Sequence, residues 1–137
     1  LLHRPRSFVA GALMKYFWQI SNSTAALYGA AVVGLSAVLM HLWQGSLSSE
    51  ALARVISALT MLAFHTLALL ALGMQRSSAK LTQLVALLWH LGLWCFVWTI
   101  LAGVFALPFH YSQLAPIGGQ LLIAAWLLCA VTAWRRS

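Results

Sequence analysis

Apolar residues fill four long windows of the chain, and short polar stretches separate them. The windows cover residues 24–43, 51–74, 81–107 and 114–134. Each one is long enough to cross the hydrocarbon core of a bilayer, which takes about 20 helical residues at a rise of about 1.5 Å each. Backbone groups in lipid must bond within their own segment, and the sequence lacks the short alternating strands of a barrel. The pattern therefore predicts four membrane-spanning helices.

The segment before the first window has a different pattern. In residues 6–20, apolar side chains recur at helical spacing, and Lys15 and Gln19 fall on the opposite side. This predicts an amphipathic helix that lies flat among the lipid headgroups. A signal peptide is the competing interpretation, but the apolar core is short, Lys15 interrupts it and no A-x-A cleavage signal follows. Side-chain oxygens in residues 21–24 favour a hinge, which divides the chain into an interfacial segment, 1–23, and a transmembrane domain, 24–137.

Composition supports the membrane assignment. Apolar residues make up 63% of the chain and charged residues 7%, whereas soluble proteins average about 45–50% and about 25%. A chain of 137 residues is too short for an anchor plus an enzymatic lobe. The short loops force successive helices into antiparallel contact. The predicted fold is an all-α polytopic membrane protein, a four-helix bundle preceded by the interfacial helix.

The cations indicate how the chain is oriented. Seven of the eight lie before the first window, between the second and third, or after the fourth, and the positive-inside rule assigns this side to the cytoplasm. The eighth, Arg54, lies four residues after the only acid, Glu50, and we expect the two to pair. The net charge of +7 favours anionic lipid headgroups over nucleic acid, because the cations flank helix ends. The predicted headgroup contacts are Arg4, Arg6, Lys15, Arg76, Lys80, Arg135 and Arg136.

Two histidines fall deep inside the spans, whereas His41 lies near the outer surface. Counting along the helices places His65 about 14 Å from the cytoplasmic boundary and His90 at a similar depth on the neighbouring helix. Two opposed imidazoles at one level are what ligation of a b-type haem requires. A simpler interpretation is a hydrogen bond between helices, with Thr66 and Thr132 as candidate partners. We expect the hydrogen bond and no cofactor, with haem b, or a quinone or proton role, as the alternative.

Two further groups of residues are candidate sites. Gln120, His41 and Arg54 fall at the same outer level, beneath Tyr111, and predict an outer polar cluster or a water-binding site. Trp94 and Trp98 recur at a spacing of four residues after His90 and form a bulky stripe on the third helix. This stripe favours either lipid contact or a surface for another membrane protein.

Catalytic chemistry has little support. The single carboxylate cannot form a two-acid pair, and the sequence offers no Ser-His-Asp, Cys-His or metal-carboxylate arrangement. Cys95 and Cys129 lie in apolar windows without a C-x-x-C spacing, which predicts reduced packing residues. The spans also lack the charged rings and broken helices of a transporter, although a homo-oligomer would be able to build a polar path. We expect a protein that is not an enzyme.

Two sequence stretches carry a family resemblance. AFHTLALL (63–70) and APIGGQLLIAAWLL (115–128) resemble the YgdD-like family of small four-helix bacterial inner-membrane proteins of unknown function. The best match is a packing motif in which proline begins a helix and glycines admit a neighbour. The chain departs from the family at Met61 and Leu62, where members carry a Tyr-Gln pair. The motif consists of Pro116, Gly118, Gly119 and Trp126.

Elimination and resemblance together give the functional hypothesis. We expect an accessory or stabilising subunit of a larger complex in the bacterial inner membrane, with both termini in the cytoplasm. Lipids and the partner complex would be its contacts, with homo-oligomerisation an open alternative. An electron-transfer subunit that uses haem or quinone at His65 and His90 is the first alternative function. An oligomeric pore or small transporter is the second.

Overall fold

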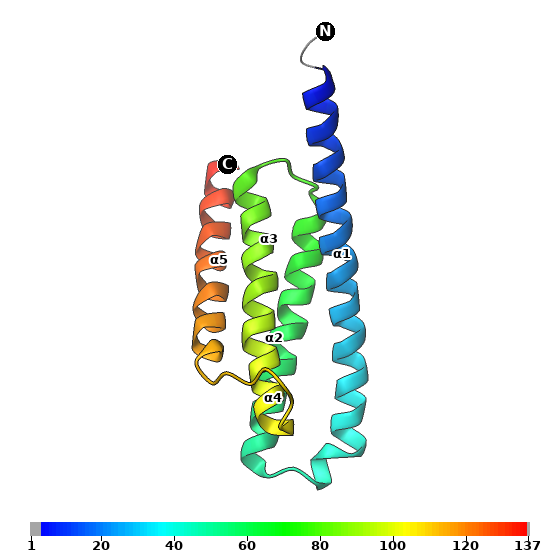
Figure 1. Ribbon diagram of the computed structural model, residues 1–137, viewed down its shortest axis with the longest axis vertical. Helices are drawn as coiled ribbons and strands as arrows, with labels where there is room; N and C mark the ends of the chain where they lie inside the picture. Colours follow the sequence, from blue (N-terminus) through cyan, green and yellow to red (C-terminus); the bar gives the residue numbers. More distant parts are fainter. Residues whose placement is uncertain (1–3, 137) are drawn as a thin grey trace.

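The structure, a computed structural model, describes the backbone of residues 4–136 and the side chains of residues 7–135. The predicted headgroup contacts of Arg4, Arg6 and Arg136 therefore lie outside the described side chains. Helices account for nearly all of the described chain, which contains no strand. Figure 1 shows five labelled α-helices: α1 (Arg4–His41), α2 (Ser49–Met74), α3 (Lys80–Leu93), α4 (Thr99–Phe105) and α5 (Leu114–Arg136).

Four helical segments are long and apolar enough to cross a membrane, which confirms the predicted fold class. The third combines α3, a π-helical turn at Trp94–Trp98 and α4 into one 26-residue segment. The apolar pattern of the sequence predicts all four segments but not the π-helical turn. Their bounds are Ser7–His41, Ser49–Met74, Lys80–Phe105 and Leu114–Arg135.

The first helix is continuous, so the predicted hinge at residues 21–24 is wrong. Helix α1 runs without interruption for 38 residues. The polar side chains in this stretch contact other helices instead of capping a new one: the Ser21 hydroxyl bonds His90, and Asn22 packs against Gly73. Trp18 already belongs to the buried core. The division at residue 23 thus corresponds to no break in the helix, and the N-terminal part of α1 projects beyond the bundle (Figure 1).

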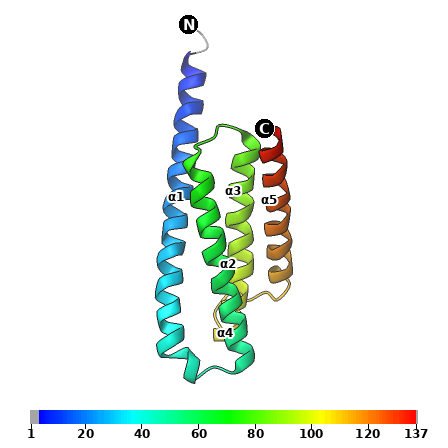
Figure 2. The same ribbon diagram turned by 180° about the vertical axis from the view of Figure 1, so that it is seen from behind.

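The helices pack in two unequal pairs. Helix α3 makes its most extensive contacts with α5, and helix α1 makes its most extensive contacts with α2. Helices α1 and α5 lie at opposite edges of the bundle in both views (Figures 1 and 2). The largest fully buried side chains come from every span except α5: Trp18, Val55, Leu69, Thr82, Val85, Trp89 and Leu93. Since α1 packs mainly on α2, much of its length faces away from the rest of the bundle.

The close pairing of α3 and α5 depends on glycine. A Cβ atom at Gly118 would lie 2.6 Å from the backbone nitrogen of Phe96 and 2.8 Å from the carbonyl oxygen of Gly92. The predicted packing motif therefore contains one glycine in direct backbone contact with a neighbour. The second, Gly119, has ordinary clearance, with its nearest neighbour atom 4.0 Å away on the Phe96 ring. Pro116 is exposed in the first turn of α5.

The chain termini and the α2–α3 loop lie at the same end of the bundle (Figures 1 and 2). The loop is tied to α1, because the indole Nε1 of Trp18 donates a hydrogen bond to the carbonyl oxygen of Ser77 at 2.8 Å. At the other end, Ser48 caps α2 by accepting a hydrogen bond from the Ala51 amide at 3.1 Å. The expected Arg54–Glu50 ion pair is confirmed there at 2.7 Å.

Candidate functional site

His65 connects α2 to α5. Its Nδ1 lies 2.8 Å from the carbonyl oxygen of Met61, one turn earlier, and a carbonyl can only accept. Nδ1 therefore carries the proton, and Nε2 accepts a hydrogen bond from the indole Nε1 of Trp126 at 3.0 Å. Two partners thus fix one tautomer and one ring orientation. The ring of Trp89 completes the cluster, with centroids 4.7 Å from Trp126 and 6.2 Å from His65.

The hydrogen bond expected between helices has a different partner from those predicted. Thr66 donates to the carbonyl oxygen of Leu62 at 2.6 Å, and Thr132 donates to that of Cys129 at 2.7 Å. Both hydroxyls thus satisfy their own helices, as threonines in apolar helices commonly do. Trp126 was singled out in the packing motif, but sequence spacing alone could not pair it with a histidine on another span.

We expect His65 and Trp126 to be energetically coupled. In a double-mutant cycle with His65→Phe and Trp126→Phe, the coupling free energy should be about 0.6–1.7 kcal/mol, the range for hydrogen bonds between membrane helices. Reversible unfolding in detergent micelles would measure it. Pairing His65→Phe with Trp134→Phe is the control, because Trp134 is 83% exposed. Equal coupling in the two cycles would contradict the assignment.

His90 connects the third span to α1. Its Nε2 lies 2.9 Å from the Ser21 hydroxyl, and its Nδ1 lies 2.8 Å from the Tyr28 hydroxyl. A neutral imidazole carries one N–H, so one hydroxyl donates to the ring and the other accepts from it. Ser21 and Tyr28 are seven residues apart on one face of α1, and Ala25 between them is fully buried. This spacing was the available sequence signal for the contact, which was not predicted.

The two histidines bond in different directions. His65 bonds to α5 and its own helix, whereas His90 bonds to α1. All four ring nitrogens have partners within the chain, so ligation of haem by both rings would require each to give up a bond. This geometry does not favour the haem or quinone alternative, which stays a prediction. Among the described residues, no group of three or more His, Cys, Asp or Glu side chains could hold a metal ion.

The predicted outer polar cluster is not joined by hydrogen bonds. His41, Arg54 and Gln120 are all exposed, and Arg54 bonds Glu50. Within the part of the chain that the structure describes, no hydrogen bond links any two of the three. The outer loop bonds the third span instead: His110 Nδ1 donates to the carbonyl oxygen of Thr99 at 3.2 Å, since a carbonyl can only accept.

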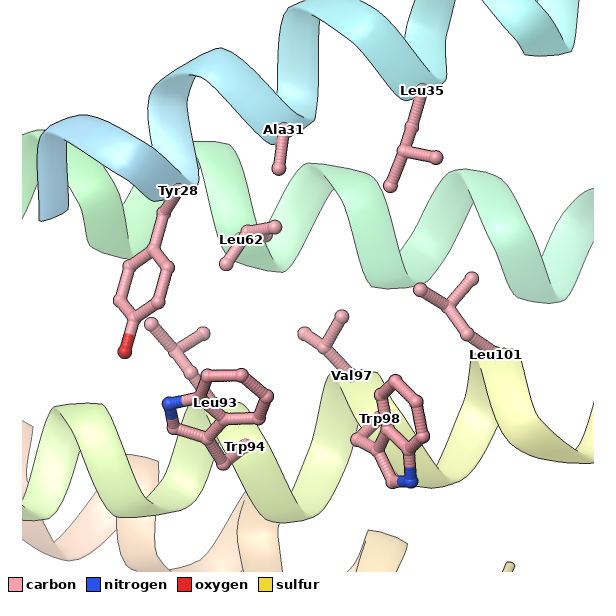
Figure 3. A pocket seen from close by; sticks show the side chains of 9 residues that line it. All are labelled: Tyr28, Ala31, Leu35, Leu62, Leu93, Trp94, Val97, Trp98 and Leu101. Atoms are coloured by element: carbon pink, nitrogen blue, oxygen red, sulfur yellow. The ribbon is translucent and has the colours of Figure 1, made fainter. Parts of the chain in front are cut away.

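A lateral groove lies between α1 and the third span, because α1 packs on α2 and leaves this side open (Figure 3). It encloses about 200 Å³. The predicted partner surface, Trp94 and Trp98, forms part of one wall (Figure 3). The Trp98 indole Nε1 donates to the carbonyl oxygen of Pro108 at 3.1 Å, which fixes that ring. The remaining lining residues are Tyr28, Ala31, Leu35, Leu62, Leu93, Val97 and Leu101.

Together these features define a small polytopic helical membrane protein in which His65 and His90 connect neighbouring helices. The chain belongs to a family described as "Protein of unknown function (DUF423)", whose model matches residues 35–119. The resemblance seen in the sequence is consistent with this membership, although the match does not carry the YgdD-like name. No curated protein and no solved structure matches the chain.

Proposed function

We propose that this protein is a non-enzymatic accessory subunit that docks onto a larger complex in the bacterial inner membrane, with both termini in the cytoplasm. One observation carries the proposal: a tryptophan is exposed in the middle of a span. Trp94 lies 14 residues after Lys80 and 11 before Phe105, the two ends of the third span. Its side chain is 57% exposed.

The position of Trp94 is unusual for a lipid contact. Tryptophans that face lipid settle at the membrane interfaces, where the indole N–H meets headgroups and water. A mid-span tryptophan at the surface is better explained by a protein contact, because tryptophan is enriched among the residues that dominate binding energy. The adjoining groove is too small for a helix, which is about 10–12 Å across, but it accepts bulky side chains. We therefore assign a transmembrane segment of a partner protein to this surface.

The polar groups inside the spans support a docking role over a chemical one. Both ring nitrogens of His65 and of His90 are engaged within the chain: His65 bonds α5 and its own helix, and His90 bonds α1. The only carboxylate in the sequence, Glu50, is ion-paired at a helix end. The large side chains that the spans present outward are mostly apolar, which suits contact with lipid and with another membrane protein and offers no reactive group.

Mild-detergent purification of the tagged chain tests the proposal. We expect one larger membrane complex to co-purify at constant stoichiometry. Trp94→Leu should weaken its retention by about tenfold, as expected for a central interface residue worth more than about 1 kcal/mol. Mass spectrometry of the native complex would identify the companion and measure its ratio to the chain.

The matched control is Trp134→Leu, which removes an exposed tryptophan at the end of α5. It should leave co-purification unchanged. Purification of the wild-type chain without a companion protein, in several mild detergents, would contradict the accessory role. An equal loss with both substitutions would contradict the assignment of the partner surface to Trp94.

A further inference from the structure

A second pocket lies at the end of the bundle that carries the termini. It encloses about 250 Å³ between α1 and Arg76, the second residue after the end of α2. Lys15 and Gln19 are one turn apart on α1, and Asn22 continues the same face. Its lining residues are Met14, Lys15, Trp18, Gln19, Asn22 and Arg76.

Local packing builds this pocket. The hydrogen bond from the Trp18 indole to Ser77 holds the loop against α1. Asn22 lies so close to Gly73 that a Cβ atom there would overlap the amide, which fixes the end of α2 beside α1. Arg76 then has a φ of 45°, a left-handed conformation that costs energy for a residue with a side chain. The arginine is thus held in a defined turn next to the helix that carries Lys15.

The pocket carries two positive charges from separate elements. Lys15 belongs to α1 and Arg76 to the α2–α3 loop. The only Asp or Glu in the sequence is Glu50, which lies at the opposite end of α2 and is paired with Arg54. No acidic side chain can therefore neutralise this pair, and an anion from outside the chain is the complementary partner.

We propose that this pocket binds the phosphate group of one anionic phospholipid. The pocket lies where the spans end, which is the depth of the headgroup phosphates, and basic pockets on this side of a helix bundle suit anionic lipids. The Arg76 guanidinium supplies paired donors for phosphate oxygens, and Lys15 supplies a point charge. Met14 and Trp18 give the glycerol region an apolar wall. This is one saturable site, formed by two cations that line a common pocket, whereas the attraction of separate cations to a membrane surface is diffuse.

Native mass spectrometry of the purified full chain tests the site, with phosphatidylglycerol and phosphatidylcholine as probes. We expect one phosphatidylglycerol per chain to be retained, and no phosphatidylcholine under the same conditions. Lys15→Gln with Arg76→Gln should weaken retention about tenfold or more, given the contribution of each cation near anionic lipid. Lys15→Arg with Arg76→Lys keeps both charges and should retain at least part of the affinity.

The matched control is Lys80→Gln with Arg135→Gln, which removes the same charge at the same end but outside the pocket. We expect less than a twofold change. Similar losses for the two glutamine pairs would show diffuse attraction and overturn the proposal, as would equal retention of the two lipids. Displacement of phosphatidylglycerol by an equal concentration of inorganic phosphate would overturn the assignment to a lipid. None of these outcomes depends on whether a partner complex binds at Trp94.

Discussion

Gly118→Ala should lower the free energy of unfolding by about 2–3 kcal/mol, near the upper end for overpacking a close contact. The added methyl group would meet backbone atoms of Phe96 and Gly92 at 2.6 and 2.8 Å. Backbone atoms in a helix cannot rotate away as side chains do, so α5 would have to move off the third span. Reversible unfolding of the purified protein in mixed micelles would measure the loss.

Gly34→Ala is the matched control, since a Cβ atom at Gly34 in α1 meets nothing within 4 Å. This substitution should leave stability unchanged or raise it by up to about 1 kcal/mol, because alanine is the better helix former. If both alanine variants lost the same stability, the close approach of α5 to the third span would not be the cause.

His90→Leu should have the second-largest effect, a loss of about 2 kcal/mol, because it leaves two hydroxyls inside the bundle without their partner. Ser21 and Tyr28 are both buried, with 4% and 8% of their surfaces exposed. These hydroxyls attach α1 to the third span, so the distance between those two segments should also vary more. Unfolding equilibria would measure the loss, and crosslinking between introduced cysteines on α1 and α3 would report the detachment.

Two substitutions make this prediction specific. His41→Leu removes an exposed histidine near the other end of α1 and should change stability by less than about 0.5 kcal/mol. Tyr28→Phe should cost less in the His90→Leu background than in the wild type, because its hydroxyl has already lost the imidazole. Additive losses from Tyr28→Phe and His90→Leu would show that the two side chains do not interact.

The spans could be predicted from the sequence because crossing lipid imposes length and apolar content on each helix independently. The bounds of α2 and α5 differ from prediction by a few residues. The first helix was harder, since a polar stretch such as Ser21 and Asn22 has the same appearance as a hinge or as an interhelical contact. Only the neighbours, His90 and Gly73, decide between these, and neither is close in sequence.

The candidate sites were predicted less well for a related reason. Counting residues gave the depth of His65 and His90 but not the direction in which each ring points. Direction depends on rotation of each helix about its axis, and that is set by packing such as the contact of Gly118 with the third span. The resulting partners, Trp126 and Tyr28, are 61 and 62 residues away in sequence. The similar depth of the two histidines therefore suggested one shared site. The rotation of their helices instead directs each ring to a different neighbouring helix.

The uninterrupted first helix has a mechanical consequence. At 38 residues it is about 57 Å long, well beyond the roughly 30 Å of a bilayer core. No flexible joint separates its projecting end from Trp18, Ser21 and Tyr28. A rotation or sideways displacement of the projecting end would thus be transmitted along a rigid helix. It would reach the hydrogen bond from Trp18 to the α2–α3 loop, the bonds to His90 and the wall of the groove. We therefore expect a molecule that binds the projecting end of α1 to change the width of the groove.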